Sequence, residues 1–524
     1  MLRKIRITLA VLMLTAITLL FVAPSPTASA WLGWTTRLQL VPALLAGSMG
    51  VVAVLALVTL LVGRVYCSVI CPLGVMQDVV SWASARRKGH HMRFAYRHGH
   101  RWLRYGVLAL FVLLLLSGLG ALATLLAPYS TFGRIAQSIF SPLAHAVVGL
   151  LGHQQEAATA TALPGTAPWG AGLAALAVAT IALIVTGTLA WRSGRTYCNA
   201  LCPVGTTLGL LSRFALLRPV IDASRCTGCQ RCARHCKASC IDVRNLHIDL
   251  SRCVACMDCT DVCRHDAIGL RLRTRQPSSA TSPAAQDRAA QDNKPQANAA
   301  NGRTVNAARR TLVGLPVLLT LPHLAWAQAS DTAEHFDATG HGQRGTQAQE
   351  PVTRATPVLP PGALSAQHLA NHCVGCQLCV ASCPSHVLRP SFKVGTFMQP
   401  HLSYAQGSCA PECNRCSEVC PTGAIYPISL AEKSATRIGH AEWVRSACLA
   451  STTGIPCHEC ARQCPSGAIL MAPQYPSDPS SPRTPHIDVT RCTGCGACEH
   501  ACPASPCKGI YVEGHAVHSQ YHTT

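Results

Sequence analysis

Five apolar stretches stand out along the chain, separated by polar segments. They lie near residues 5–23, 38–63, 103–127, 168–191 and 311–327. The second, third and fourth are long enough to cross a bilayer as helices, because about 20 apolar residues span its hydrocarbon core. A weaker stretch at 135–152 contains Pro142 and His145. It predicts a segment that lies at the membrane interface rather than one that spans.

The first apolar stretch has two interpretations. It follows a basic N-terminus and precedes Ala28-Ser29-Ala30, which is also the pattern of a secretory signal peptide. We favour a helix that is retained. In both cases the chain emerges outside, so the topology of the rest is unchanged. With the first helix retained, we predict a four-helix transmembrane bundle.

The basic residues orient this bundle. The formal net charge is +21, which in a soluble protein suggests nucleic acid as a partner. Here the arginines concentrate in residues 64–102 and after residue 191, whereas 24–37 has only Arg37 and 128–167 has only Arg134. The positive-inside rule places both basic segments in the cytoplasm. We therefore predict a multi-pass protein of the bacterial inner (cytoplasmic) membrane and no nucleic-acid partner.

Cysteines carry the chemistry of the chain. Of 30 cysteines, 24 follow the rhythm C-x2-C-x2-C-x3-C with small variations. The six sets are Cys226, Cys229, Cys232 and Cys236; Cys253, Cys256, Cys259 and Cys263; Cys373, Cys376, Cys379 and Cys383; Cys409, Cys413, Cys416 and Cys420; Cys448, Cys457, Cys460 and Cys464; and Cys492, Cys495, Cys498 and Cys502. This spacing is typical of [4Fe–4S] iron ligands, in which the fourth cysteine binds the cluster of a partner motif. It predicts up to six clusters and an electron conduit.

Two other readings of many cysteines fit less well. A disulfide framework favours small secreted domains. A zinc site takes its ligands as two separated pairs, whereas the rhythm here has three cysteines at x2 intervals and a fourth at x3. A proline also follows four of the six motifs, as in iron–sulfur motifs, at Pro384, Pro421, Pro465 and Pro503. No C-x-x-C-H motif is present, so c-type haem attachment is not indicated.

Four further cysteines form an internal repeat. Residues 63–74 match residues 194–205, and each copy holds a C-x3-C-P motif after an apolar stretch. The motif cysteines are Cys67 and Cys71, then Cys198 and Cys202. In a helix, residues i and i+4 share a face, so each copy presents two thiols together. As redox candidates they hold a metal centre, cycle between dithiol and disulfide, or shape a substrate pocket; packing at helix ends is the structural alternative.

The sequences GRVYCSVICP and GRTYCNALCP, each at the end of an apolar helix, resemble the NapH/MauN family of membrane polyferredoxins. NosR-like proteins share the same core. The resemblance covers about residues 1–272 and implies four membrane helices, a cytoplasmic two-cluster ferredoxin and quinol oxidation for periplasmic reductases. The extracytoplasmic flavin domain of NosR-type proteins has no counterpart, since the first outer stretch spans only about residues 24–37.

The first ferredoxin unit occupies residues 226–263. Cross-ligation assigns Cys226, Cys229, Cys232 and Cys263 to one cluster, and Cys253, Cys256, Cys259 and Cys236 to the other. Lys237 and Arg264 replace the usual proline. Nearby cations favour the reduced cluster and raise its potential. Cys240 and Cys507 are left over; we take both as spare thiols, with Cys240 as the possible substitute ligand.

A second apolar signal follows this unit. Residues 273–306 have the composition of a disordered linker. Arg309 and Arg310 then precede the apolar run 311–327, which is the pattern for export of folded cargo. A fifth helix is the alternative, although Pro316 and Pro322 weaken a straight helix.

The second ferredoxin unit carries the other four motifs, with insertions in the second and third. Cys-Pro-x-Gly-Ala-Ile recurs at residues 420–425 and 464–469. The unit is similar to NapG/MauM ferredoxins and also to NapF ferredoxins. This resemblance implies that motifs pair outer with outer and inner with inner.

The fold class is therefore multi-domain, a four-helix transmembrane bundle plus α+β bacterial-type [4Fe–4S] ferredoxin domains. The domains are the bundle at 1–218, a two-cluster ferredoxin at 219–272, a linker at 273–306, the twin-arginine-like segment at 307–328, a second linker at 329–365 and a four-cluster ferredoxin at 366–524. We expect 219–272 in the cytoplasm and 366–524 in the periplasm.

The predicted function is that of a quinol dehydrogenase component. Electrons would pass from the quinone pool to a periplasmic reductase of the nitrate reductase type or to a cytochrome partner. A maturation factor for a reductase and a general polyferredoxin are the alternatives. There is no Rossmann fingerprint or P-loop, so substrate reduction belongs to a partner. We read His90, His91, His98 and His100 as solvated loop histidines rather than acceptors of quinol protons.

Overall fold

The computed structural model describes residues 2–86, 94–150, 169–272 and 352–520. The predicted linker 273–306, the twin-arginine-like segment 307–328 and most of the linker 329–365 lie outside the described residues. His90 and His91 also lie outside them.

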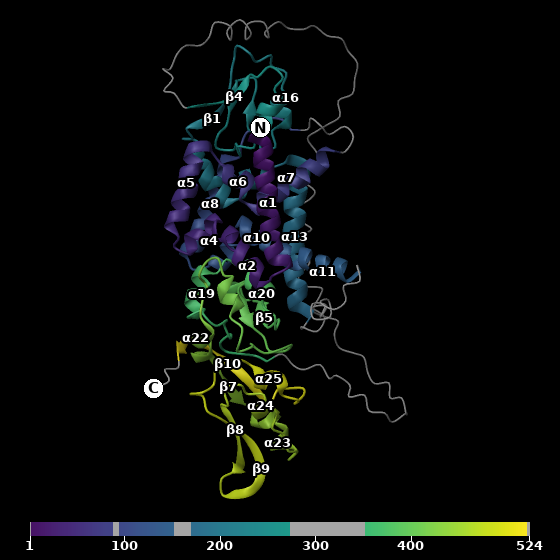
Figure 1. The fold of residues 1–524 in the computed structure, drawn as a ribbon, viewed down its shortest axis with the longest axis vertical. Helices are drawn as coiled ribbons and strands as arrows, with labels where there is room; N and C mark the ends of the chain where they lie inside the picture. The colour runs from purple at the N-terminus through teal and green to yellow at the C-terminus, as the bar shows by residue number, and fades with distance from the viewer. Residues whose placement is uncertain (1, 87–93, 151–168, 273–351, 521–524) are drawn as a thin grey trace. The chain divides into compact units, whose positions relative to one another are not determined.

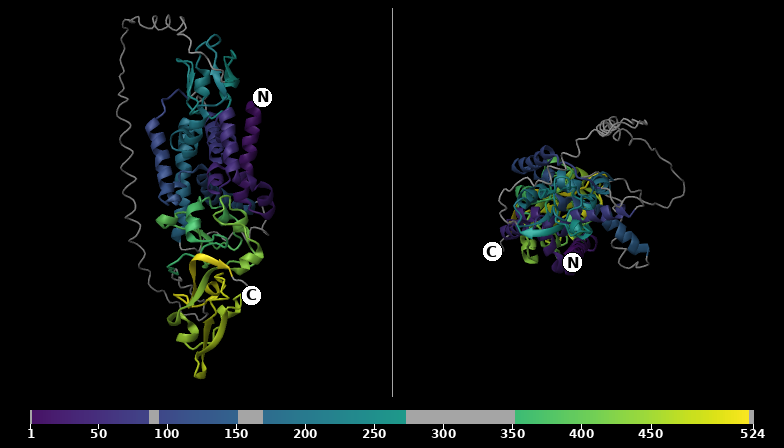
Figure 2. Two further views of the ribbon diagram at one scale, coloured as in Figure 1. Left: turned by 90° about the vertical axis from the view of Figure 1, so that its left-hand side faces the viewer. Right: turned by 90° about the horizontal axis from the view of Figure 1, so that it is seen from above.

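Long helices form the first part of the chain. They are α1 (Leu2–Val22), α5 (Met49–Val62), α8 (Arg101–Leu116) and α13 (Trp169–Ser193). Their axes are roughly aligned with one another, both in the front view (Figure 1) and in the side view (Figure 2). Among the described residues, only Leu2–Val22 and Leu173–Ser193 are long and apolar enough to cross a membrane. Four spanning helices are therefore not confirmed.

Two predicted spanning helices are interrupted at glycines. The stretch 38–63 folds as α4 (Leu40–Leu45) and α5, with Gly47 at φ +68° between them. The stretch 103–127 folds as α8 and the short α9 (Gly120–Ala123), with Gly118 at φ +76° between them. Glycine takes up this left-handed conformation without a steric penalty and so ends helices readily.

The stretch predicted to lie at the interface belongs to a longer helical run. This run comprises α10 (Pro128–Ile135), the π-helical turn η1 (Ala136–Phe140) and α11 (Ser141–Leu150). Every residue of α10 is buried. Arg134, which the sequence placed among outer loop charges, is thus inside a buried helix.

The two C-x3-C-P repeats fold alike. Each has a short helix, a turn at the second cysteine, and a longer helix that begins at the motif proline. The helices are α6 (Val65–Val69) and α7 (Pro72–Ala85), then α14 (Thr196–Ala200) and α15 (Pro203–Ser212). Proline suits the first helical position, where its missing N–H costs no hydrogen bond. The helices α2 (Pro26–Leu32) and α3 (Trp34–Arg37) complete the bundle.

The first ferredoxin unit is small. Strand β1 (Leu217–Ile221) pairs antiparallel with β4 (Ile268–Leu272), and β2 (Ile241–Asp242) with β3 (His247–Ile248). Its helices are α16 (Arg231–His235) and α17 (Asp258–Val262). The core holds isoleucines and cysteines with no aromatic side chain among its buried members.

The second ferredoxin unit has three antiparallel pairs. They are β5 (Leu388–Pro390) with β6 (Pro400–Leu402), β7 (Thr436–Trp443) with β10 (Ile510–Gln520), and β8 (Ile469–Tyr475) with β9 (Asp478–Ile487). The helices are α19 (Ala366–His372), α20 (Leu378–Ala381), α21 (Arg415–Glu418), α22 (Leu430–Ala435), α23 (Leu449–Thr452), α24 (Glu459–Arg462) and α25 (Ala497–Ala501), with 3-10 turns η2 (Val394–Thr396) and η3 (Arg445–Ala447). The β8–β9 hairpin extends beyond the rest of the unit (Figure 1).

The bundle contacts both ferredoxin units. One buried apolar cluster contains bundle residues together with Val254 of the first unit and Val374 and Leu378 of the second. At the start of α1, Arg3 pairs with Asp258 at 3.0 Å. At its end, α1 contacts α20. The two ferredoxin units therefore contact opposite ends of this helix, whose 21 residues extend about 30 Å.

Candidate iron–sulfur centres

In the first ferredoxin unit, the cysteines gather in two groups of the predicted composition. One small cavity is lined by Cys226, Cys229, Cys232 and Cys263. The other is lined by Cys236, Cys253, Cys256 and Cys259. The first three cysteines of each motif thus meet the fourth cysteine of the other, and each donor set fits one [4Fe–4S] cluster.

Cys240 lies in the second of these cavities. Its side chain is 1% exposed, its Sγ is 3.5 Å from that of Cys236, and it lines the same cavity. Five cysteines therefore surround one candidate cluster. The geometry allows Cys240 to replace Cys236 as well as to remain a spare thiol.

In the second ferredoxin unit, the motifs group with their neighbours in sequence. Cys379 lies near Cys373, Cys376 and Cys420, and Cys416 lies near Cys409, Cys413 and Cys383. Cys460 lies near Cys448, Cys457 and Cys502, and one cavity is lined by Cys464, Cys492, Cys495 and Cys498. The expected pairing of outer with outer and inner with inner motifs is therefore wrong.

The four groups of the second unit follow one another in a definite order. The first group begins at the bundle, because Cys376 belongs to the buried core that the bundle shares. Cys383 and Cys420, the exchanged cysteines, join the first group to the second. The backbone N–H of Cys409 donates to the Cys495 carbonyl at 2.9 Å, so the second group lies next to the one that Cys492 begins. The group with Cys448 is last.

Local backbone conformation explains how the regular motifs curl. The residue after the second cysteine is left-handed in four motifs, at Gln230, Met257, Gln377 and Gly496. Each is the N-cap of the short helix that carries the third cysteine. In the two motifs with insertions, Asn414 and His458 take this place with negative φ values of −119° and −139°. Changed spacing thus accompanies a changed turn.

The four C-x3-C-P cysteines are buried together. Each is 3% or 4% exposed, and all belong to the core cluster of the bundle. A Cβ atom at Gly74 would lie 2.4 Å from the Cys67 carbonyl oxygen, and one at Gly205 would lie 2.2 Å from that of Cys198. Glycine at the end of each repeat therefore lets the second helix cross closely over the first.

Two buried arginines join the repeats by exchange. Arg64 of the first repeat donates to the Gly205 carbonyl and to Asn199 Oδ1 in the second, both at 2.7 Å. Arg195 of the second repeat donates to the Cys67 carbonyl in the first. Both arginines are 0% exposed. Arg64 also donates to the Cys253 carbonyl at 3.1 Å, so it links the cysteine quartet to the first ferredoxin unit.

Asp78 organises the charges around the quartet. Its carboxylate accepts from Arg195 Nε at 2.9 Å and pairs with Arg6 at 3.1 Å and Lys237 Nζ at 3.7 Å. Lys237 also pairs with Asp258 at 3.0 Å. The cation predicted to raise the potential of the nearby cluster thus has two carboxylate partners, which weaken its influence. Sequence reasoning missed Asp78; its being the single charged residue of α7 was the available signal.

Among the described residues, no three Cys, His, Asp or Glu side chains lie close enough to hold a single metal ion. A cubane cluster separates its ligand sulfurs more widely than one ion does. His98 and His100 are exposed, as predicted for solvated loop histidines.

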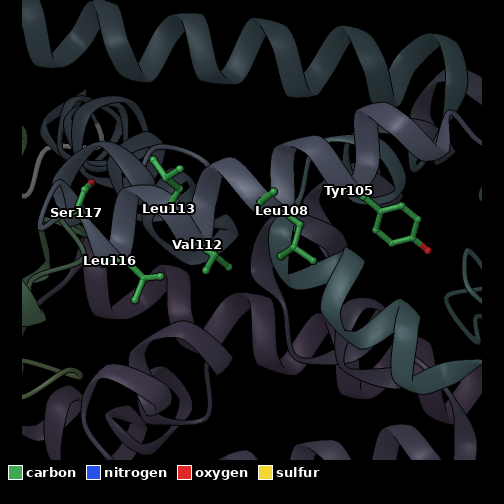
Figure 3. A pocket seen from close by; sticks show the side chains of 7 residues that line it. Tyr105, Leu108, Val112, Leu113, Leu116 and Ser117 are labelled. Carbon is green, nitrogen blue, oxygen red and sulfur yellow. The ribbon is translucent and has the colours of Figure 1, made fainter.

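A groove of about 640 Å³ runs along α8. Leu108, Val112, Leu113 and Leu116 lie along it, between Tyr105 and Ser117 (Figure 3). Its lining includes no cysteine and no charged side chain. We place no redox chemistry there.

Family models match both kinds of cysteine motif. A model described as a 4Fe-4S binding domain matches residues 44–90 and 172–221, each with one C-x3-C-P motif. A 4Fe-4S dicluster domain matches residues 372–424 and 455–505, and another 4Fe-4S binding domain matches residues 246–269. The two dicluster matches divide the second unit as the neighbouring pairs do.

Curated relatives cover parts of the chain. The methylamine utilization ferredoxin-type protein MauN of Paracoccus denitrificans is 31% identical over 214 residues, which are 40% of this chain and 58% of MauN. MauM of Methylobacillus flagellatus is 33% identical over 85 residues, 15% of this chain and 35% of MauM. The chain thus matches just over half of one relative and about a third of the other. No solved structure matches. The predicted resemblance to MauN-type and MauM-type proteins is confirmed.

Proposed function

We propose that this protein is a transmembrane electron relay. Its homology to MauN and MauM, together with the 4Fe-4S domains, makes it an iron–sulfur electron-transfer protein. The protein takes electrons from the quinol pool and delivers them to a reductase or cytochrome outside the bacterial inner membrane. A periplasmic reductase of the nitrate reductase type is the first acceptor to test.

The observation that carries this proposal is the attachment of the ferredoxin units to opposite ends of α1. Arg3 holds the first unit through Asp258 and Asp261, at 3.0 Å and 2.6 Å. At the other end, the Phe21 ring and the Cys376 carbonyl both meet Gly133. An apolar helix of about 30 Å matches the hydrocarbon core of a bilayer. We therefore assign 219–272 to the cytoplasm and 366–524 to the periplasm.

The same contacts favour a retained α1. Ile17 and Phe21 are 0% exposed in the bundle core, and Arg6 pairs with Asp78, whose side chain is 13% exposed. Cleavage after Ala30 would remove these contacts from a completed fold.

Six cysteine groups would hold the redox centres. A bound [4Fe–4S] cluster supplies uptake and release of one electron at a time. The chain supplies the order: the Cys226 and Cys253 groups precede the bundle, and the groups that begin at Cys373, Cys409, Cys492 and Cys448 follow it. The exposed Cys229 marks the outermost group of the first unit.

We include Cys67, Cys71, Cys198 and Cys202 in the relay. Arg64 spans from the Cys253 carbonyl to Gly205, three residues beyond Cys202. The quartet therefore lies between the first unit and the rest of the bundle core. Four buried thiols remain compatible with a dithiol–disulfide pair or with a multinuclear metal centre, whereas they do not lie close enough to hold a single metal ion.

The first experiment determines the side of the second ferredoxin unit. Alkaline phosphatase, or a fluorescent protein that folds only in the cytoplasm, is fused after Thr524 of the full chain. Active phosphatase and no fluorescence are expected. Fluorescence without phosphatase activity would overturn the relay and favour a cytoplasmic maturation factor.

The second experiment tests the donor. Membranes with the full chain receive menadiol, and bleaching of iron–sulfur absorbance is followed with time. Bleaching is expected in the wild type, and slower bleaching in Cys67→Ser/Cys198→Ser at equal iron content. Absence of bleaching in the wild type would contradict quinol as the donor.

A further inference from the structure

Helix α10 carries buried polar atoms without hydrogen-bond partners. They are Tyr129 Oη, Ser130 Oγ, and Nε and Nη1 of Arg134. Each of these side chains is 1% exposed. Native proteins leave few such groups unpaired, and each unpaired group calls for an explanation.

Arg134 is the costliest of the three. Its Nη2 donates to the Thr124 and Leu125 carbonyls, at 3.3 Å each, and no described carboxylate pairs with it. A buried guanidinium without an anion is strongly unfavourable. Some negative charge should therefore lie nearby in the working protein.

The neighbouring group is the first cysteine set of the second ferredoxin unit. A Cβ atom on Gly133 would lie 2.4 Å from the Cys376 carbonyl oxygen. The Tyr129 hydroxyl lies within interaction range of the Cys376 thiol and of Thr36. The acidic groups that act on the Arg134 guanidinium are the Tyr197 hydroxyl first and the Cys376 thiol second. Tyr129 and Arg134 of α10 thus lie near Cys376, a residue that would hold a cluster.

The chemistry of that set supplies the missing anion. Cys373, Cys376, Cys379 and Cys420 would bring four thiolates, whose charge an iron–sulfur core offsets only in part. Reduction adds one more negative charge. A fixed cation and a donated hydrogen bond both favour the reduced form, and so raise the reduction potential.

We propose that the bundle sets the potential of this cluster: Arg134 supplies the counter-charge, and the Tyr129 hydroxyl donates a hydrogen bond to the Cys376 sulfur. This rests on the proposed function, since it concerns the centre that would link the bundle to the second unit. Both are positioning residues, because neither is a cluster ligand.

The chain holds a parallel at the next cysteine set. Lys433 is 7% exposed, and its Nζ donates to the carbonyls of Ala410 and Cys413. It also acts on the Cys409 sulfur. A buried lysine of the second unit thus does for the second set what the bundle's arginine does for the first.

The test is a redox titration of the full chain in membranes, followed by electron paramagnetic resonance. In Arg134→Gln, the ratio of reduced to oxidised cluster at fixed potential should fall about tenfold in one component, which is a shift of about 59 mV to lower potential. Arg134→Lys should keep the reduction potential of this component close to the wild-type value. Tyr129→Phe should give a smaller shift of the same sign in the same component.

Two control variants sharpen the result. Arg37→Gln removes an equal charge from an exposed position and should move no component. Lys433→Gln should move a different component from Arg134→Gln. Unchanged potentials in Arg134→Gln, with normal iron content, would overturn the inference. If Arg134→Gln does not fold, unchanged potentials in Tyr129→Phe would overturn the hydrogen-bond part, and a shift there would support it.

Failure of the proposed function has another signature. Wild-type membranes without iron–sulfur signals would remove the relay itself. Signals that are present but insensitive to Arg134 would leave the relay and remove only the tuning.

Discussion

The two ferredoxin units differ in the interactions that join them to the bundle. Among the described residues, ion pairs join only the first unit to the bundle, although Val254 of this unit also lies in the bundle core: Arg3 pairs with Asp258, Lys237 pairs with Asp78, and Arg64 donates to the Cys253 carbonyl. The second unit is attached through close apolar packing, with Val374 and Leu378 inside the bundle core.

This difference follows from the local sequences. Arginines and lysines gather at one end of the helices, so carboxylates and carbonyls of the first unit find partners there. Gly133 lies at the other end, where the backbone of Cys376 comes within contact of α10. Charge tolerates small shifts of geometry, whereas close packing does not. The first unit also makes close contacts, since a Cβ atom on Gly194 would lie 2.5 Å from the Lys237 carbonyl oxygen and one on Gly209 would lie 2.6 Å from that of Ser251. We therefore expect added volume to disturb either attachment, and loss of charge to disturb the first.

Iron removal should give the largest effect and act on both units alike. The core of each unit contains its cysteines, and ligation free energy is folding free energy in such sites. Oxidation with ferricyanide and EDTA should make both units sensitive to trypsin while the helical circular dichroism of the bundle persists. A trypsin-resistant second unit after complete iron loss would contradict this.

Asp78→Asn should weaken the attachment of the first unit and leave that of the second largely unchanged. It leaves Arg195, Arg6 and Lys237 around a neutral side chain, and breaking a buried ion pair costs about 3–5 kcal/mol. Denaturant unfolding should show this loss, and limited proteolysis should cut the first unit sooner than the second.

Asp222→Asn is the matched control for that variant. Asp222 and Arg271 form an ion pair of 2.8 Å within the first ferredoxin unit, but Arg271 is 61% exposed. Exposed pairs contribute about 0–1 kcal/mol. Equal losses in the two variants would show that the Asp78 cluster is no special attachment.

Gly133→Ala should act on the second unit. The added methyl would lie 2.4 Å from the Cys376 carbonyl and 3.0 Å from the Phe21 ring, and overpacking costs about 1–3 kcal/mol. Proteolysis should now cut the second unit sooner. At Gly187, in α13, nothing lies within 4 Å, so Gly187→Ala should be neutral or stabilise by up to about 1 kcal/mol. A neutral Gly133→Ala would mean that the second unit is loosely seated.

The sequence predicted these parts unequally. Cysteine spacing is local, so the grouping of Cys226, Cys229 and Cys232 with Cys263 was accessible from the motif alone. The grouping of Cys420 with Cys373 was not accessible in this way. The four motifs of the second unit have the same spacing whether each motif pairs with its neighbour in sequence or the outer two and the inner two pair with each other. Apolar length predicted α1 and α13 well. It could not reveal that Gly47 and Gly118 take positive φ and interrupt two other helices.

The polar residues of the bundle show the same limit. Arg134 counted as a loop charge, since its burial depends on α10 packing under the second unit. Asp78 drew no attention, because its three basic partners lie in α1, at the start of α14 and in the first ferredoxin unit. Only the tertiary fold brings such groups together.

Acid should weaken the second unit more than the first, and this is the smallest effect we predict. Burial, with the nearby Arg354 and Lys393, lowers the pKa of His401 to about 4; burial and His515 lower the pKa of His518 to about 4. Each ring is neutral when folded, and the unfolded pKa is about 6.5. Their stabilisation is complete above that pH and is lost as pH falls from about 6.5 toward 4. Between pH 7.5 and 5.5, each should cost about 1 kcal/mol. His518→Gln should flatten this dependence in denaturant unfolding, whereas the exposed His98→Gln should not; an unchanged profile in His518→Gln would remove that histidine from the account.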